Sequence, residues 1–390
     1  MPRRVLAAIV VSSGLFLTVT SLPLAGQSSS AAATPPLIIT AYNGGPPIAY
    51  TVPKTPWGDP DLQGTWSSDD ATMPLNRPQN QTGLYLPAAE FKKRQQEIAA
   101  AVRRNEEEAT STFRNDFARR AFAQTSLVVD PPDGRMPAPT AEARTRAAPR
   151  DRGTFGDGPF DSYTDFTLYD RCITRGIVGS VLRVIYGNGN RIVQAPGLVA
   201  ISYEMIHDTR VIYTDGRAHP GDGIRQYLGT SRGRWEGDEL VVETTSLTDQ
   251  TSIGLNGNGL RHSNRMRLTE RLRRVAPDIL QYQVTVEDPI TYPRPFTISM
   301  PLTPLDGGVL LPYDCHEGNL AIAQSLSAER AEDAALAADL AKGIKRERRG
   351  VQESGAGGGR VRGGRGAGDG RGGAGRGTGT EAPPEGDQER

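Results

Sequence analysis

The sequence predicts an α+β protein built mainly on antiparallel β-sheet, closed into a barrel or folded into a sandwich, with helices before the sheet and one helix after it. Two observations carry this prediction. Between about residues 165 and 315, short segments are rich in β-branched and aromatic residues and alternate apolar with polar side chains, which is typical of half-buried strands. No helix-forming stretch interrupts these segments, so successive strands are expected to pair antiparallel.

The individual strands are short. Segments with strand composition lie at 198–206, 210–214, 232–235, 239–244, 266–275, 279–286, 296–302 and 309–313. Glu236-Gly237-Asp238 and Ala276-Pro277-Asp278 each separate two of them and predict tight turns, hence two hairpins. Gly64-Thr65-Trp66 and Thr214–Arg217 resemble short lipocalin motifs, so a lipocalin-like barrel is one form that the sheet is expected to take.

Residues 1–33 have the layout of a secretory signal peptide. Arg3-Arg4 is cationic, Val5–Val19 is apolar, and Ala31–Ala33 supplies small residues for cleavage. A retained anchor helix is the alternative, but such helices usually need about 18 or more apolar residues. We therefore expect a periplasmic or secreted protein with no membrane span after signal removal.

The mature chain divides by composition into an N-terminal part and a β domain. Residues 61–160 are expected to be helical and irregular, with helix-forming composition over 87–124. Residues 161–346 are expected to form the antiparallel β domain. A closing helix at about 325–346 follows the last strand, with Ser327 as its expected N-cap.

Two further segments are expected to lie outside any core. Residues 34–60 are rich in Pro and Gly and predict an extended arm, while the Arg/Gly-rich residues 347–390 predict a disordered tail. Lys plus Arg and Asp plus Glu are equal at 45 each, so no net charge attracts nucleic acid. We expect a small-molecule ligand or substrate and no nucleic-acid partner; the sequence leaves the oligomeric state open.

The chain has two cysteines, Cys172 and Cys315. An exported protein meets an oxidising compartment, so we expect them to form a disulfide. Two buried free thiols are the alternative. A disulfide between the two cysteines closes the long loop from residue 172 to residue 315, which in the chain-entropy model adds about 4–5 kcal/mol to the free energy of unfolding.

A first polar cluster falls at the junction of two predicted strands. It contains Glu204, His207, Asp208 and Arg210. A carboxylate neighbour can orient the His207 imidazole and raise its pKa, which makes it an acid or base near neutral pH. The alternative is a hairpin turn in which Asp208 bonds the backbone and His207 only packs.

A second polar cluster follows the last predicted strand. It runs from Tyr313 to Asn319 and includes Asp314, Cys315, His316, Glu317 and Gly318, and a disulfide would bring Arg171 close to it. So many polar groups in a short connector need partners wherever they are buried, which favours a site. Helix capping and turn formation are the alternative.

The sequence contains no P-loop, dinucleotide fingerprint, His-Glu-x-x-His or Gly-x-Ser-x-Gly motif. Glu204, His207, His316 and Glu317 have the side chains that zinc or iron uses, but their spacing matches no known ligand pattern. We therefore predict no cofactor, and keep a metal held by His207 and His316 as a minor alternative.

A set of motifs in fixed order resembles a known family. The motifs are Thr55–Trp66 (TPWGDPDLQGTW), Pro74–Pro78, Leu127–Arg135, Glu204–Asp208 (EMIHD), Ser231–Asp238 (SRGRWEGD), Asp288-Pro289 with Arg294-Pro295, and Cys315–Asn319 (CHEGN). Over about residues 53–330 the chain resembles a large family of uncharacterised exported bacterial proteins, with Phe296 and Tyr227 standing where that pattern has Trp. The resemblance implies that both polar clusters belong to a shared pattern, and it names no reaction.

Two functions follow as hypotheses. In the first, an exported enzyme uses His207 and His316 to move protons on a small molecule, Glu204 and Glu317 orient them or act as bases, and Arg171 or Arg210 holds an anionic group, as in a hydrolase, lyase or isomerase. In the second, the barrel or sandwich binds an apolar or aromatic ligand without catalysis. The pocket would then be lined by Trp66, Trp235 and Tyr203, and Asn319 is a further candidate ligand-binding residue.

Overall fold

The computed structural model describes residues 49–107, 118–147, 160–221, 223–305 and 307–348. The predicted signal peptide, the first part of the predicted arm and nearly all of the predicted tail lie outside the described residues.

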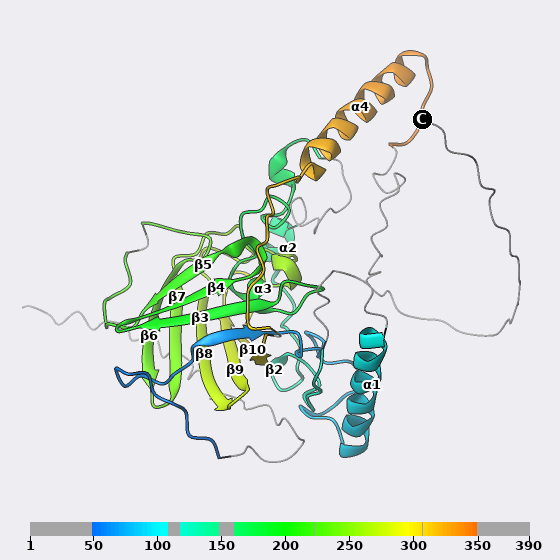
Figure 1. Ribbon diagram of the computed structural model, residues 1–390. Helices are drawn as coiled ribbons and strands as arrows, with labels where there is room; N and C mark the ends of the chain where they lie inside the picture. Colours follow the sequence, from blue (N-terminus) through cyan, green and yellow to red (C-terminus); the bar gives the residue numbers. More distant parts are fainter. Residues whose placement is uncertain (1–48, 108–117, 148–159, 222, 306, 349–390) are drawn as a thin grey trace, which may run out of the picture. The chain divides into compact units, whose positions relative to one another are not determined.

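The described residues form a closed β-barrel (Figure 1). The strands are β1 (Gly64–Ser67), β2 (Val128–Asp130), β3 (Gly189–Ala195), β4 (Leu198–Tyr203), β5 (Thr209–Tyr213), β6 (Thr230–Glu236), β7 (Glu239–Thr245), β8 (Arg267–Ala276), β9 (Ile279–Glu287) and β10 (Phe296–Pro304). Nine of these described strands close the barrel because β1 pairs with both β3 and β10. The strand β2 pairs with the start of β10, on the edge that β1 occupies at the end of β10. The predicted α+β class is confirmed, and the sheet takes the barrel form.

The barrel is antiparallel at every described pairing except one. The expected hairpins are present as β6–β7 and β8–β9, with turns at Gly237 and at Pro277-Asp278. The strands β5 and β6 run parallel and share only two register pairs, Ile212 with Ser231 and Tyr213 with Arg232. This seam and the β1–β10 closure, which also has two register pairs, are therefore the shortest pairings in the wall of the barrel.

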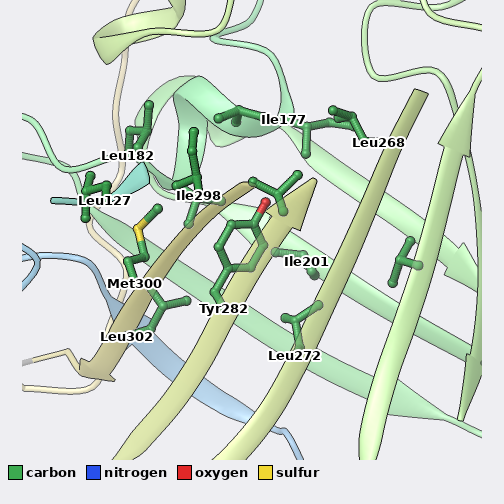
Figure 2. Packing of buried hydrophobic residues seen from close by; sticks show 14 of the residues in the cluster. Leu127, Ile177, Leu182, Ile201, Leu268, Leu272, Tyr282, Ile298, Met300 and Leu302 are labelled. Carbon is green, nitrogen blue, oxygen red and sulfur yellow. The ribbon is translucent and has the colours of Figure 1, made fainter. Parts of the chain in front are cut away.

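Inward-facing side chains fill the barrel. In β9, Leu280, Tyr282 and Val284 alternate with glutamines, as the two-residue period of a strand requires. Figure 2 shows Tyr282 sharing the interior with Ile298 and Met300 of the neighbouring β10. These buried side chains supply the hydrophobic stabilisation of the wall.

The outer faces of β9 and β10 are also buried. The segment that leads into β2 covers them, and the Gln124 side chain donates to the Ser299 carbonyl at 2.7 Å. Beneath it, the Gln281 side chain donates to the Ser299 hydroxyl at 2.9 Å. Polar outward residues are thus hydrogen-bonded under a second layer of chain, which satisfies groups that water cannot reach.

The helices differ from expectation in their ends. They are α1 (Ala88–Glu107), α2 (Ala141–Ala147), α3 (Ile177–Val181) and α4 (Ala321–Ala341), with short 3-10 turns at Tyr163–Asp165, Met205–His207 and Leu255–Gly257. None of the described helices has the length and apolarity to cross a membrane.

The predicted helix over 87–124 is too long at its C-terminal end. Residues 118–124 are not helical: the Asp70 carboxylate accepts the backbone N–H groups of Arg119 and Arg120, and Phe122 is fully buried. Tertiary burial thus overrides the helical propensity of this stretch.

The C-terminal helix begins earlier than expected. It starts at Ala321 rather than near 325, so Ser327 lies inside it and is not its N-cap. The reason is that the residues before Ser327 are themselves helix formers and continue the helix toward its N-terminus.

The predicted strand at 309–313 is not a strand. Closure of the barrel through β1 and β10 leaves no edge for it, and the Leu311 N–H donates to the Glu204 side chain instead. Conversely, β3 was not expected, because its start at Gly189-Asn190 follows Gly187-Asn188 and has the composition of a turn.

Candidate functional site

The two predicted polar clusters meet at one end of the barrel. Glu204 follows β4, and its two carboxylate oxygens accept the N–H groups of Gly189 at 2.9 Å and Leu311 at 3.1 Å. This buried carboxylate therefore joins the start of β3 to the segment that follows β10. Both hydrogen bonds are accepted from backbone N–H groups, so the Glu204 carboxylate connects these two segments of the chain.

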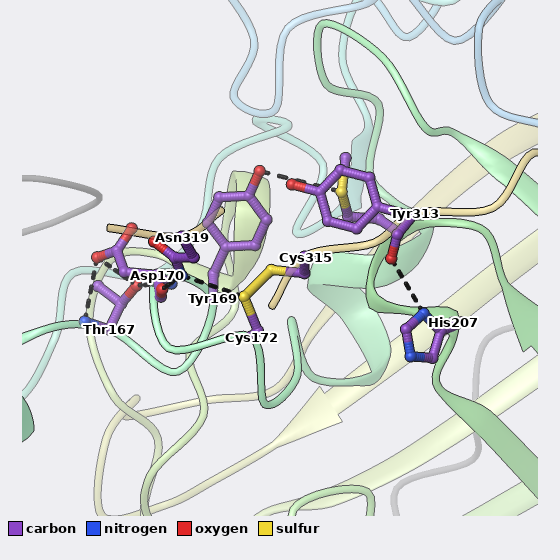
Figure 3. The surroundings of a disulfide bond; sticks show 9 residues. Thr167, Tyr169, Asp170, Cys172, His207, Tyr313, Cys315 and Asn319 are labelled. Atoms are coloured by element: carbon purple, nitrogen blue, oxygen red, sulfur yellow. Dashed lines mark hydrogen bonds between the residues drawn. A yellow bond between two sulfur atoms is a disulfide. The ribbon is translucent and has the colours of Figure 1, made fainter. Parts of the chain in front are cut away.

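His207 makes a second link between the clusters (Figure 3). Its Nδ1 lies 3.1 Å from the Tyr313 carbonyl, and the side chain is otherwise exposed. His207 and the preceding Ile206 both have a positive φ, of 44° and 65°, so the turn holds two non-glycine residues in the left-handed region. Next to them, Asp208 accepts from the Thr174 hydroxyl at 2.8 Å, and burial raises the pKa of Asp208.

The predicted disulfide between Cys172 and Cys315 is confirmed, with Cα atoms 5.7 Å apart. Asn319 supports it: its side-chain amide donates to the Asp170 carbonyl at 3.0 Å and lies 3.3 Å from the Cys172 sulfur (Figure 3). The Arg171 guanidinium lies over the Tyr163 ring, 5.1 Å from its centroid.

The remaining predicted catalytic residues, His316 and Glu317, lie exposed in the turn that leads to α4. Within the described ranges, no three His, Cys, Asp or Glu side chains are grouped as a metal site would need. The two predicted polar clusters thus lie at the same end of the barrel. Most of the hydrogen bonds that their side chains make there are to backbone groups.

Arg210 points into the barrel and forms an ion pair. Its two terminal nitrogens donate to the Glu270 carboxylate at 2.5 and 2.9 Å, and the Tyr282 hydroxyl donates to the same carboxylate at 2.9 Å. Burial by itself lowers the pKa of Arg210, but the charge and hydrogen bonds of Glu270 together with the nearby Tyr203 and Tyr282 outweigh it and raise that pKa. Burial also raises the pKa of nearby Tyr203 to about 12. The charge of Arg210 is therefore balanced inside the barrel.

Trp235 is partly buried and packs against the main core from β6. Its Nε1 is buried and has no hydrogen-bond partner among the described groups. The structure places this side chain with the core residues rather than along the cleft described next.

A cleft of about 900 Å³ opens at the parallel seam between β5 and β6. Its lining takes residues from both strands, from the connection between them and from the loops that flank the seam. They include Ile173, Thr174, Asp208, Arg210, Val211, Tyr213, Arg225, Tyr227, Leu228, Ser231 and Arg232. The sparse pairing of the two strands leaves room for this opening.

The cleft carries an excess of positive charge. Arg225 donates to the carbonyls of Asn264 at 2.6 Å and Leu247 at 3.3 Å, and Arg232 donates to the Ala218 carbonyl at 3.0 Å. Neither arginine has an ion pair with a carboxylate in the described part of the chain. Their charges are held in place by backbone carbonyls and remain uncompensated.

A buried histidine outside the predicted clusters also has defined partners. His262 Nε2 lies 2.5 Å from the Thr251 hydroxyl, and its Nδ1 lies 2.9 Å from the Ser263 carbonyl. Burial lowers its pKa, and the smaller effect of the Asp288 charge opposes this. A neutral ring with Nδ1–H donating and Nε2 accepting satisfies both contacts.

The sequence did not lead us to predict the two cleft arginines, Arg225 and Arg232, or the buried His262. The available signal for the cleft was the density of arginines between the predicted strands, at Arg217, Arg225 and Arg232. Comparison with protein-family models, with curated proteins and with solved structures found no match. The family resemblance therefore stays a prediction.

Proposed function

We propose that this protein is an extracytoplasmic β-barrel that binds a small organic anion in the cleft between β5 and β6. The observation that carries the proposal is the pairing of a cleft of about 900 Å³ with two arginines that lack carboxylate partners. Ligand sites in proteins commonly have about 300–1,000 Å³, with apolar walls and a few placed polar groups.

The rest of the lining indicates the body of the ligand. Val211, Leu228 and the rings of Tyr213 and Tyr227 supply apolar and aromatic surface. The Arg232 guanidinium lies 5.5 Å from the centroid of the Tyr213 ring, so charge and aromatic surface are adjacent. An aromatic or apolar molecule with one carboxylate, sulfonate or phosphate group fits this combination.

The compartment is argued from two features. The N-terminal residues have the composition of a signal peptide, and Cys172 and Cys315 form a disulfide. Disulfides persist mainly in oxidising compartments. Both features support a periplasmic or secreted protein.

The hypothesis of acid–base catalysis stays a prediction. Both carboxylate oxygens of Glu204 accept hydrogen bonds from backbone amides, and His207 Nδ1 faces a backbone carbonyl. These contacts connect loops, which is a structural role. The uncompensated arginines of the cleft favour binding as the main function.

The proposal is tested by fluorescence titration with two probes of similar shape. One is 8-anilinonaphthalene-1-sulfonate, an aromatic anion; the other is N-phenyl-1-naphthylamine, which lacks the sulfonate. We expect Arg225→Gln and Arg232→Gln each to weaken binding of the sulfonate about tenfold or more, because a hydrogen bond to a charged group contributes about 1.5–3 kcal/mol. Binding of the uncharged probe should change little.

Arg234→Gln is the matched control. Arg234 lies on β6, as Arg232 does, but pairs with Glu236 and Glu243 outside the cleft. Its loss should therefore leave the binding of both probes unaffected. Equal affinity of the sulfonate for wild type and both cleft variants would refute anion recognition there. Loss of both probes in Tyr213→Ala and Tyr227→Ala would locate the aromatic part of the ligand.

A further inference from the structure

Arg175 is a buried cation without a counter-ion. It lies just before α3 and is 1% exposed. Its Nη2 donates to the Leu182 carbonyl at 3.4 Å, while Nε and Nη1 are buried and have no hydrogen-bond partner among the described residues. The described residues also give it no ion pair with a carboxylate.

Three tyrosines lie near this guanidinium. The phenols of Tyr169, Tyr186 and Tyr313 lie near enough to act electrostatically on Arg175, and the Tyr169 hydroxyl lies 4.0 Å from the Met205 sulfur. Figure 3 shows the Tyr169 and Tyr313 hydroxyls facing each other beside the Cys172–Cys315 disulfide. The segments on either side of that disulfide thus build the cluster together.

The phenols do not neutralise the guanidinium. Burial raises the pKa of both Tyr169 and Tyr186, so these phenols keep their protons at neutral pH. Burial lowers the pKa of Arg175 to about 10, which still leaves it charged near pH 7. A buried charge without a partner is costly, and each buried N–H without an acceptor adds to that cost. The cluster lacks a negatively charged acceptor.

We propose that Arg175 and the phenols of Tyr169, Tyr186 and Tyr313 form a binding site for a small, singly charged anion, either a halide or the carboxylate of a small acid. The anion accepts from Arg175 Nε and Nη1. A single negative charge balances the single positive charge, whereas a doubly charged phosphate would bring an uncompensated charge into a buried place.

The site is separate from the proposed cleft. None of its four residues lines the cleft between β5 and β6. The Tyr186 side chain is 41% exposed, so the group of phenols extends from the buried guanidinium to the surface. Tyr186 is thus the member of the cluster that is most exposed to water.

The first test compares thermal unfolding in sodium chloride, sodium formate and sodium gluconate at matched ionic strength. Gluconate controls for screening, because it is too bulky for the cluster. We expect chloride, formate or both to raise the folding equilibrium constant in proportion to one plus the ratio of anion concentration to dissociation constant, hence about elevenfold at ten times the dissociation constant. Stabilisation by chloride alone indicates a halide, and stabilisation by formate indicates a carboxylate. Equal stabilisation by all three salts would overturn the proposal.

Variants locate the effect. Arg175→Met should lose the anion-specific stabilisation, and Tyr186→Phe should weaken the apparent anion affinity. Tyr163→Phe is the control, since Tyr163 is 58% exposed and lies outside the cluster. An anion effect that is unchanged in Tyr186→Phe and in Arg175→Met would refute the site.

A structural readout remains if Arg175→Met does not fold. Crystals of the wild-type protein grown in sodium bromide should show an anomalous peak within hydrogen-bonding distance of Arg175 Nε and Nη1. A peak that appears only elsewhere on the molecule, with water at this position, would overturn the halide form. The carboxylate form of the proposal would then be decided by the thermal unfolding experiment in sodium formate.

Discussion

Arg210 and Arg175 are both buried arginines, yet only Arg210 has a carboxylate partner among the described residues. Arg210 lies inside the barrel wall and makes two hydrogen bonds to Glu270, which also accepts from Tyr282. Arg175 is near the phenols of three tyrosines, and two of its nitrogens have no acceptor among the described residues. One charge is balanced within the chain and the other is not.

The difference separates a structural role from a binding role. A buried cation that is balanced by a carboxylate of the same chain has no need of a charged ligand, whereas removing one member of the pair leaves the other charge buried and unpaired. A buried guanidinium with unused donors gains by taking a ligand. His262 shows a third solution, because burial keeps its ring neutral between a hydroxyl and a carbonyl.

The largest effect is expected from breaking the balanced pair. Glu270→Leu should lower the free energy of unfolding by about 3–5 kcal/mol, because it leaves Arg210 charged and unpaired inside the barrel. Urea unfolding followed by near-UV circular dichroism measures this. The double variant Arg210→Met with Glu270→Leu should recover most of the loss. A single variant that is as stable as wild type would show that the pair is not balanced in the way we describe.

A smaller effect is expected from His262 as pH falls. Burial lowers its pKa in the folded state, so below about pH 6.5 the unfolded chain binds a proton that the folded protein does not. Stability is then fully present above about pH 6.5 and decreases as pH falls, by at most about 1.4 kcal/mol per pH unit for one proton. Urea unfolding between pH 7 and 5 should show this slope.

His262→Gln should flatten that slope. His219→Gln is the matched control, because burial also lowers the pKa of His219 but the side chain is less enclosed. Asp288, whose pKa is lowered by hydrogen bonds from Ser263 and Thr291, acts at lower pH and lies outside this window. An identical slope in His262→Gln and wild type would assign the pH dependence to other groups.

The smallest effect is expected from Arg175 without its anion. In sodium gluconate, Arg175→Met should change the free energy of unfolding by no more than about 1 kcal/mol, because it removes a charge that has no counter-charge to lose. Arg210→Met under the same conditions should be clearly destabilising, since it leaves Glu270 unpaired. A loss as large for Arg175 as for Arg210 would mean that the two arginines are equally well paired.

The sequence predicted what depends on local pattern. The alternation over 239–244 and 279–286 placed β7 and β9, and the turns at Gly237 and Pro277 placed their hairpins. The disulfide was expected from compartment alone. Each of these follows from neighbouring residues or from redox conditions.

The sequence could not predict what depends on distant partners. Closure of the barrel requires β1 and β10 to pair across more than two hundred residues. The same holds for Arg210 and Glu270, 60 residues apart, so Arg210 was expected to face a ligand. Arg175 follows an apolar residue, a threonine and a cysteine, and nothing in that context marks it as a buried charge.

The parallel seam and the disulfide together have a consequence for proteolysis. The connection between β5 and β6, in which Gly223 and Ile224 are exposed, separates the chain into a piece with β1–β5 and a piece with β6–β10. Cys172 belongs to the first piece and Cys315 to the second. A single backbone cut there would produce a two-chain molecule held by one covalent bond, which migrates as one species on a gel until a reducing agent divides it.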